Sequence, residues 1–356
     1  DEETVMVLRG KLCELLVQVN PKLYRQYVKT TAKGQPILYV KLAKALYGLL
    51  RSALLFYRKL SKELVEHGFV INPYDPCVAT KMIPTSAKTA EIAIKINNSL
   101  PNKDENFVVP SHHQQTVTWH VDDLKSSHID PLENSKFALH LSKLYNVKGM
   151  KKITIHRGPV HDYLGMDFDF TRAHIDGTVS ISMIKNLSKI FADFPEEITN
   201  TRTSPATDRL FDIREDDDKK KDPLPEELAT HFHHSVAQLL FLCMRARRDV
   251  HTAVSFLTTR VRAPDRDDWG KLKNVLKYLK GTRHMKLNIT IDTMSTMHWY
   301  VDASYGTHND MKGHTGMIMT MGKGALMSAS KKQKLNSKSS TESELIGVDD
   351  VVSQIL

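Results

Sequence analysis

Residues 117–128 read Val117-Thr118-Trp119-His120-Val121-Asp122-Asp123-Leu124-Lys125-Ser126-Ser127-His128. Apolar and polar residues alternate up to Val121 and an extended pattern resumes at Leu124, so the sequence predicts a β-hairpin with two carboxylates at its tip. Aspartate is common in tight turns because its side chain hydrogen-bonds the nearby backbone, which is one explanation for the pair. The other is metal binding, since Mg²⁺ takes hard oxygen ligands and two-metal phosphoryl transfer needs carboxylates on rigid backbone.

Composition indicates a folded protein of two or three compact units. The chain has 356 residues, of which 41% are hydrophobic, so each unit can bury a core. No run of about 18 uncharged apolar residues occurs and the start lacks the regions of a secretory signal, so we expect no membrane association. Three cysteines, Cys13, Cys77 and Cys243, are too far apart for a disulfide framework or a thiolate zinc site. We therefore expect a reducing, intracellular compartment.

The net charge favours a polyanionic partner without identifying one. Fifty Lys and Arg against 41 Asp and Glu give a formal charge of +9. The basic residues concentrate in 143–157, 245–283 and 331–338. Such patches bind nucleic acid through counterion release, but many basic proteins do not bind nucleic acid at all. Charge alone leaves both alternatives open.

Periodicity mixes helices and strands, which argues against both an all-helical and an all-strand fold, and the expected class is α+β. One apolar helical stripe comprises Ala53, Tyr57, Leu60 and Leu64, and it ends at Gly68. A second comprises Trp269, Leu272, Leu276 and Leu279. Beside the second lie Lys273, Lys277 and Lys280, either as a solvated edge or as a surface that grips a nucleic-acid backbone. Strands are predicted at 117–121, at 299–301, and in a hairpin of 317–321 with 325–330.

Two polar stretches, 84–115 and 212–225, have the composition of insertions or linkers. The chain starts without Met and stops inside a predicted helix, so we expect a piece of a longer product. A histidine cluster at 231–234 lacks cysteine partners at ligand spacing, which favours a polar helix face over a zinc site.

Several motifs together resemble the reverse transcriptase of copia-type retrotransposons in order and spacing. They are Leu46-Tyr47-Gly48-Leu49, Gly68-Phe69, Tyr74-Asp75-Pro76-Cys77 and His120-Val121-Asp122-Asp123, then Tyr163-Leu164-Gly165-Met166, Ala246-Arg247-Arg248-Asp249-Val250 and 269–282. Near the end, the motifs Val301-Asp302-Ala303-Ser304-Tyr305, Lys331-Lys332-Gln333-Lys334 and Ser339-Ser340-Thr341-Glu342-Ser343-Glu344-Leu345 resemble the start of that family's ribonuclease H domain. Any one motif is weak, but their shared order over about residues 35–356 is hard to obtain by chance.

The resemblance implies a right-hand polymerase followed by a truncated ribonuclease H-like α/β domain. Fingers and a palm built on an antiparallel sheet would occupy residues 1–200, truncated at the N-terminus and with an insertion at about 84–115. A helical thumb and connection would follow at 201–290, and the ribonuclease H-like domain at 291–356.

The resemblance also assigns residues to sites. Asp122 and Asp123 would bind two Mg²⁺ ions in the polymerase, and Asp302 with Glu344 would supply part of a second two-metal site. The nucleotide and template pocket would be lined by Tyr47, Gly48, Leu49 and Arg51. The primer would be held by Tyr163, Leu164 and Gly165.

Local patterns near the end allow a second interpretation of Glu344. Thr341-x-x-Glu344 is also a common helix start, in which the glutamate caps the helix. The helix that follows has an apolar stripe of Leu345, Val348, Val352 and Ile355. Asp349 and Asp350 match no site of the family, so we expect them on the solvated surface.

The implied activity is RNA-directed DNA synthesis with partial ribonuclease H. The partners would be an RNA template, a DNA primer, their RNA–DNA hybrid and deoxynucleoside triphosphates. Integrase, protease and capsid parts of the polyprotein, and with them DNA integration, are expected outside this chain. The expected location is a cytoplasmic particle, or the nucleus.

Three departures from the family pattern bear on this expectation. His120 stands where the family usually has an aromatic residue, and 49–53 departs from the family's Leu-Lys-Gln-Ala-Pro. The third polymerase aspartate lies upstream in family members, and only Asp1, without its motif, is a candidate here. A palm without it would bind Mg²⁺ poorly. The alternatives are therefore a decayed, non-catalytic nucleic-acid-binding remnant, or a basic interaction module, which would not explain the motif order.

Overall fold

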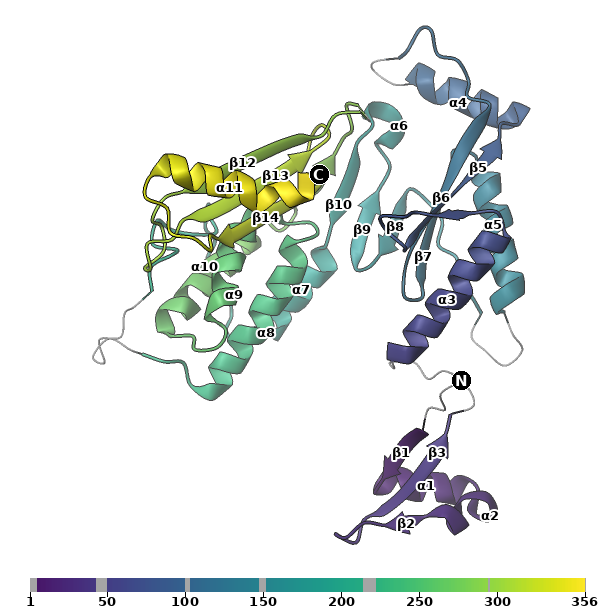
Figure 1. The fold of residues 1–356 in the computed structure, drawn as a ribbon, viewed down its shortest axis with the longest axis vertical. Coiled ribbons are helices and arrows are strands. Elements are labelled where there is room, and N and C mark those ends of the chain that lie inside the picture. Colours follow the sequence, from purple (N-terminus) through teal and green to yellow (C-terminus); the bar gives the residue numbers. More distant parts are fainter. Residues whose placement is uncertain are drawn as a thin grey trace. The chain divides into compact units, whose positions relative to one another are not determined.

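A computed structural model describes residues 5–42, 50–99, 103–146, 152–213, 222–293 and 295–355. The chain divides into two compact units, one of residues 1–85 and 111–134 and one of residues 86–110 and 135–356. Both combine helices with antiparallel sheets (Figure 1), which confirms the predicted α+β class. The boundaries expected at residues 200 and 290 stay predictions. Among the described helices, none combines the length and apolar character needed to cross a membrane.

The first unit begins with a small antiparallel sheet in the order β1–β3–β2. Its strands are β1 (Val5–Arg9), β2 (Lys29–Thr30) and β3 (Pro36–Lys41). Between the first two strands lie α1 (Lys11–Val19), α2 (Pro21–Tyr24) and the 3-10 helix η1 (Arg25–Tyr27). Cys13 of α1 and Leu38 of β3 are the fully buried side chains of this part.

The second sheet of the first unit is antiparallel in the order β4–β5–β6–β7. Its strands are β4 (Val70–Ile71), β5 (Val78–Pro84), β6 (His112–His120) and β7 (Asp123–Ser127), and α3 (Leu50–Glu66) precedes them. Leu60 and Leu64 of α3 are buried, which confirms the predicted helix and its stripe. Gly68, at φ +90°, ends the helix as predicted, because the Phe69 N–H donates to the Leu64 carbonyl at 2.9 Å in the pattern of a left-handed glycine cap.

The stretch 84–115 is not the plain linker that its composition predicts. β5 extends to Pro84, α4 (Ala87–Ser99) occupies the middle, and β6 begins at His112. The Ser86 hydroxyl accepts the N–H of Thr89 at 3.1 Å, which caps the start of α4. The alternative of an insertion stays a prediction. The sequence did not indicate α4, because this helix buries only the small residues Thr89 and Ala93 and so shows little apolar periodicity. Residues 214–221 of the second expected linker lie outside the described residues.

Helices α7 (Ile184–Asp193), α8 (Glu226–Cys243), α9 (His251–Arg260) and α10 (Arg266–Gly281) supply the main core of the second unit. The second predicted stripe is confirmed, since Trp269, Leu272, Leu276 and Leu279 are all buried. A capping box between Asp265 and Asp268 starts α10. The remaining helices of this part of the chain are α5 (Pro131–Tyr145), α6 (Ala173–Asp176) and the 3-10 helix η2 (Arg248–Val250).

A four-stranded antiparallel sheet in the order β11–β10–β9–β8 packs against this core. Its strands are β8 (Val160–Tyr163), β9 (Met166–Asp169), β10 (Val179–Ser182) and β11 (Leu287–Ile289). Phe168 and Leu287 turn toward the core, whereas Asp169, Ser180 and Asn288 alternate with them on the other face.

The lysine edge of α10 holds a neighbouring segment of the chain. Lys273 Nζ lies 2.6 Å from Glu196 Oε2, and the Trp269 indole N–H donates to Glu196 Oε1 at 2.7 Å. The hydrogen bonds from Lys273 and Trp269 hold the pKa of Glu196 below its usual value. Lys280 donates to the carbonyl of Ile198. Two of the three lysines therefore have intramolecular partners, which neither alternative anticipated.

The third sheet, in the order β12–β13–β14, consists of β12 (His298–Ser304), β13 (His314–Thr320) and β14 (Met327–Lys332). It confirms the strand at 299–301 and the hairpin predicted after it. Helix α11 (Ser340–Ile355) lies along one face of this sheet (Figure 1).

The buried face of α11 is not the predicted apolar stripe. Leu345 and Val348 are 67% and 50% exposed, while Gly347 and Val351 face the sheet. A Cβ built on Gly347 would lie 3.2 Å from that of Ala303, so a small residue is needed for the helix to approach this closely. The buried face consists of small and polar residues, so the spacing of the large apolar residues predicted the wrong face of the helix.

One surface residue expected on α11 and the alternative helix cap both differ from the structure, whereas Asp349 is exposed as expected. Asp350 is not solvated surface, because its Oδ2 accepts from Thr315 Oγ1 at 3.0 Å and its Oδ1 lies 3.6 Å from Lys331 Nζ. The helix start is capped two residues earlier than Thr341 and Glu344 suggested. There the Ser339 hydroxyl accepts the N–H of Glu342 at 3.2 Å.

A chain of four side chains, here called the polar seam, joins the other face of the third sheet to α9. His308 Nε2 lies 3.1 Å from His314 Nδ1, His314 Nε2 lies 2.7 Å from Ser330 Oγ, and Ser330 Oγ donates to Thr252 Oγ1 at 3.2 Å. Burial, with smaller effects of His308 and His251, lowers the pKa of His314 to about 4. The seam is therefore neutral at physiological pH.

Candidate active site

The tip of the β6–β7 hairpin is a two-residue turn under backbone strain. His120 pairs with Asp123, which leaves Val121 and Asp122 as the turn. Val121 has φ +55°, and Asp122 does not share the positive φ, a combination typical of a type II′ turn. Glycine is the usual residue at that first position, and a β-branched residue there costs about 1–3 kcal/mol. Strain of this kind is concentrated at functional sites, so it distinguishes this turn from an ordinary aspartate turn.

Both carboxylates of the turn face solvent. Asp122 and Asp123 are exposed, and neither forms a hydrogen bond or ion pair through its carboxylate within the described part of the chain. Strand alternation places Asp123 and Lys125 on the same face of β7, with His120 opposite Asp123. Burial lowers the pKa of Lys125. The tip thus presents two adjacent carboxylates with a lysine on the same face.

The opposite face of the hairpin is anchored, so the turn is held on rigid backbone. Trp119 is buried, and its ring stacks on Tyr57 of α3 at a centroid distance of 6.2 Å. Lower in the hairpin, Gln115 Nε2 donates across the strands to Ser126 Oγ at 3.2 Å, and Ser126 Oγ donates to Asn134 Oδ1 at 2.8 Å. These contacts fix the strands that carry the carboxylates.

The donor chemistry of the tip suits a hard cation but offers a small ligand set. Carboxylate oxygens are the ligands that Mg²⁺ prefers, and it keeps several waters when few protein ligands are available. Among residues whose placement is described, no three His, Cys, Asp or Glu side chains are grouped as a metal site. Asp122 and Asp123 can therefore supply part of a magnesium site, and a third carboxylate has to come from elsewhere. Asp1, the candidate named from the sequence, lies outside the described residues.

Most residues of the expected nucleotide pocket cannot be placed. Tyr47, Gly48 and Leu49 lie outside the described residues, and Arg51 is described only as part of the α3 backbone. The expected primer-holding residues are in the second unit. There Tyr163 pairs with Met166, and Leu164 and Gly165 form the turn with φ of +54° and +75°.

The two carboxylates expected in a ribonuclease H site lie on neighbouring elements without contact. Asp302 is exposed on β12, and Glu344 is half-buried on α11. Ala303 packs beneath Gly347 of α11, so alternation directs Asp302 toward the other face of its strand. No hydrogen bond or salt bridge links Asp302 to Glu344 in the described ranges.

Lys125 is not among the site residues predicted from the sequence. The available signal was its position two residues after Asp123 in a strand, which places both on one face. The histidines 231–234, by contrast, lie on α8, where His234 Nε2 is 3.8 Å from Asp193 Oδ2.

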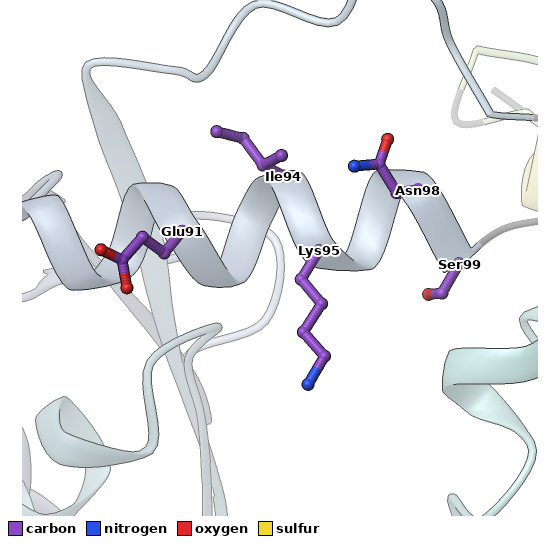
Figure 2. A pocket seen from close by; sticks show the side chains of 5 residues that line it. All are labelled: Glu91, Ile94, Lys95, Asn98 and Ser99. Atoms are coloured by element: carbon purple, nitrogen blue, oxygen red, sulfur yellow. The ribbon is translucent and has the colours of Figure 1, made fainter.

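A hollow of about 450 Å³ lies in the second unit along α4. Figure 2 shows its lining side chains, Glu91, Ile94, Lys95, Asn98 and Ser99, all on that single helix. One carboxylate and one lysine give it no arrangement suited to catalysis.

Comparison with known proteins relates the chain to transposon polyproteins. It is 22% identical over 324 residues to the retrovirus-related Pol polyprotein from transposon TNT 1-94 of Nicotiana tabacum, an alignment that covers 91% of this chain and 22% of that protein. It is 27% identical over 247 residues to a transposon Ty5-1 protein of Saccharomyces cerevisiae, covering 67% and 73% of the two chains. It is 32% identical over 127 residues to the retrovirus-related Pol polyprotein from transposon RE2 of Arabidopsis thaliana, covering 35% and 9%.

The chain thus spans about a fifth of the length of the Nicotiana polyprotein. No protein-family model matches it. No solved structure matches it either.

Proposed function

Since the chain is a relative of the Pol polyproteins of copia-type retrotransposons, we propose that its β6–β7 hairpin is the catalytic hairpin of an RNA-directed DNA polymerase. The observation that carries the proposal is the strained Val121 beside two exposed, unpaired carboxylates. An aspartate turn with no function has no reason to keep a β-branched residue at positive φ.

In this proposal Asp122 and Asp123 hold magnesium, and the strands behind them fix its position. Magnesium bound there supplies Lewis acidity, which favours ionisation of the primer 3′-hydroxyl and stabilises the departing pyrophosphate. Lys125, on the same face as Asp123, adds positive charge where phosphates of the primer or nucleotide would lie. The anchored hairpin keeps these groups in place before substrate binds, which is how a polymerase with little covalent chemistry of its own gains rate.

The wider assignment follows the same relatives. The right-hand polymerase fold with a truncated ribonuclease H-like domain, the pocket at Tyr47, Gly48, Leu49 and Arg51, and the primer contact at 163–165 are part of the proposal. Its substrates are an RNA template, a DNA primer and deoxynucleoside triphosphates. The other polyprotein parts would be its partners, in a cytoplasmic particle or the nucleus.

We assign Asp302 and Glu344 to a partial ribonuclease H site, acting on the RNA–DNA hybrid with magnesium. Support comes from their motifs, whereas the direction of the Asp302 side chain, away from α11, does not add to it.

A second function is favoured by one observation. The described residues contain no group of three possible metal ligands, and two carboxylates alone bind Mg²⁺ weakly. A non-catalytic nucleic-acid-binding remnant of a polymerase would have this ligand set.

Primer extension on an RNA template distinguishes the two functions. The assay compares the chain, a version extended upstream to supply a third aspartate, and each of these with Asp122→Asn. Asp208→Asn is the matched control, because Asp208 is exposed and has no bonded partner among the described residues. Extension that is lost in Asp122→Asn and kept in Asp208→Asn supports the polymerase. Protein that binds the hybrid but extends no primer in any version supports the remnant and contradicts the polymerase.

A further inference from the structure

A cation stacked on an exposed aromatic ring lies at the end of α8. The guanidinium carbon of Arg245 is 3.7 Å from the centroid of the Phe241 ring. Its Nη1 donates to the Phe241 carbonyl at 3.3 Å. A guanidinium has five N–H donors, and within the described ranges no acid or other acceptor takes the rest. The plane of the guanidinium is therefore fixed while most of its donors stay open.

Gly165 of the β8–β9 turn lies close to the same ring. A Cβ built on Gly165 would lie 3.9 Å from Cε1 of Phe241. Leu164 and Gly165 both have positive φ, as in the tight type I′ turn, so the tip is a rigid neighbour of the ring. The Phe241 ring therefore lies close to both the turn and the Arg245 guanidinium within the second unit.

Two acidic side chains near the turn share one lysine. Asp162 and Asp167 are directly opposed on β8 and β9, one residue pair from the tip. Lys185 Nζ lies 3.4 Å from Asp167 and 3.8 Å from Asp162, so its one positive charge offsets part of the charge of the two carboxylates. Among the described residues, no acidic side chain is paired with Arg245.

We propose that Arg245, held flat on Phe241, binds a backbone phosphate of the primer–template duplex beside the β8–β9 turn. A planar guanidinium offers parallel N–H donors that match the oxygens of a phosphate. Phosphates are rare on protein surfaces, whereas nucleic acid has one at every nucleotide. The turn and the ring rest against the sugar of the same strand. This surface rests on the proposed function for the identity of its ligand, but it is distinct from the carboxylates of the catalytic hairpin.

A structural explanation competes with this one. Arginine near a helix C-terminus interacts favourably with the last carbonyls, as the bond to the Phe241 carbonyl does here. In that case Arg245 contributes to stability and not to binding. The two explanations differ in the salt dependence of nucleic-acid binding, because only a phosphate contact releases a counterion.

The test measures binding of a fluorescent RNA–DNA hybrid by anisotropy across a range of salt concentrations. It compares the full chain with Arg245→Gln, Arg245→Lys and Phe241→Leu. Arg262→Gln is the matched control, since Arg262 is an exposed arginine of the same unit with no bonded partner among the described residues. Thermal unfolding of each variant reports the contribution to stability separately.

We expect Arg245→Gln to weaken binding about tenfold and to reduce the slope of log K against log salt by about 1, because one charge-assisted phosphate contact is lost. Arg245→Lys keeps the slope but loses part of the affinity, since a point charge cannot form the planar pair. Phe241→Leu weakens binding with the slope unchanged. Arg262→Gln changes neither.

The proposal would be overturned if the Arg245→Gln variant bound the hybrid with the affinity and salt slope of the wild type. It would also be overturned if Arg262→Gln weakened binding as much as Arg245→Gln does. A weakening with an unchanged slope and a lowered melting temperature would assign Arg245 to helix capping instead. Failure of the proposed polymerase function would give a different result. The chain would then extend no primer, while its binding of the hybrid would still depend on Arg245.

Discussion

Acid is expected to weaken the attachment of the third sheet to α9, because the polar seam is buried in neutral form. His308 and His314 are 6% and 7% exposed, and Phe211 packs against both rings at 4.8 and 4.9 Å. Burial lowers the pKa of both imidazoles, and Lys332 lowers that of His308 further while Asp310 opposes it. A proton on either ring would therefore be placed in an apolar site beside other cations.

The magnitude follows from His314. Its pKa falls from 6.5 in the unfolded chain to about 4 in the folded protein. At 1.36 kcal/mol per pH unit this difference corresponds to about 3 kcal/mol. The folded state binds fewer protons than the unfolded state below pH 6.5, so stability rises with pH. The contribution is fully present above pH 6.5, falls progressively below it, and is lost once the pH reaches about 4.

The assay is urea unfolding of the wild type and His314→Gln at several pH values between 7.5 and 4.5, followed by amide exchange of β13, β14 and α9. His314→Gln should be less stable than wild type at pH 7.5, because its bonds to His308 and Ser330 are altered, and the two stabilities should converge as the pH falls. His298→Gln, at an exposed histidine of β12, is the control, and its free energy of unfolding should change with pH in parallel with that of the wild type. Parallel curves for His314→Gln would refute the reasoning.

Three further substitutions test the packing and the turn by urea unfolding. Leu64→Ala should lower the free energy of unfolding by about 2–5 kcal/mol, because this side chain is fully buried on α3. Val65→Ala, at a 55% exposed position, should lower it by less than about 0.5 kcal/mol. Equal effects of the two variants would contradict the assigned buried face of α3. Gly313→Ala should cost about 1–3 kcal/mol, because its Cβ would lie 2.6 Å from the carbonyl oxygen of Ser304, and a neutral effect would contradict that contact. Val121→Gly should stabilise the first unit by about 1 kcal/mol, because relief of the positive-φ strain exceeds the entropy cost of glycine, and destabilisation would argue against strain at the turn.

Elements with large apolar residues at regular spacing could be predicted from the sequence. The stripes of α3 and α10 repeat with the helical period, and both are buried as predicted. The alternation before Asp122 likewise predicted the hairpin and its tip, because a two-residue turn leaves little freedom for its register.

Other features depend on contacts that periodicity does not encode. The face of α11 that packs on the sheet consists of Ser343, Gly347 and Val351. Small side chains that let the helix approach the sheet, and not large apolar ones, therefore determine which face is buried. The strain at Val121 arises only when the hairpin closes. Which carboxylates come together is a tertiary property too, and Asp302 shows it, since its strand directs it away from α11.

The central claim, that Asp122 and Asp123 hold the catalytic metal, can be tested by replacing Mg²⁺ with Fe²⁺ in the presence of hybrid and nucleotide. Added hydrogen peroxide oxidises the bound Fe²⁺ to Fe³⁺ and is reduced to hydroxide and a hydroxyl radical. The radical cleaves the nearest backbone, and the fragments are sized by mass spectrometry. We expect cleavage within 119–124 that disappears in Asp122→Asn and persists in Asp208→Asn. Cleavage elsewhere, or cleavage at the hairpin that does not depend on Asp122, would contradict it.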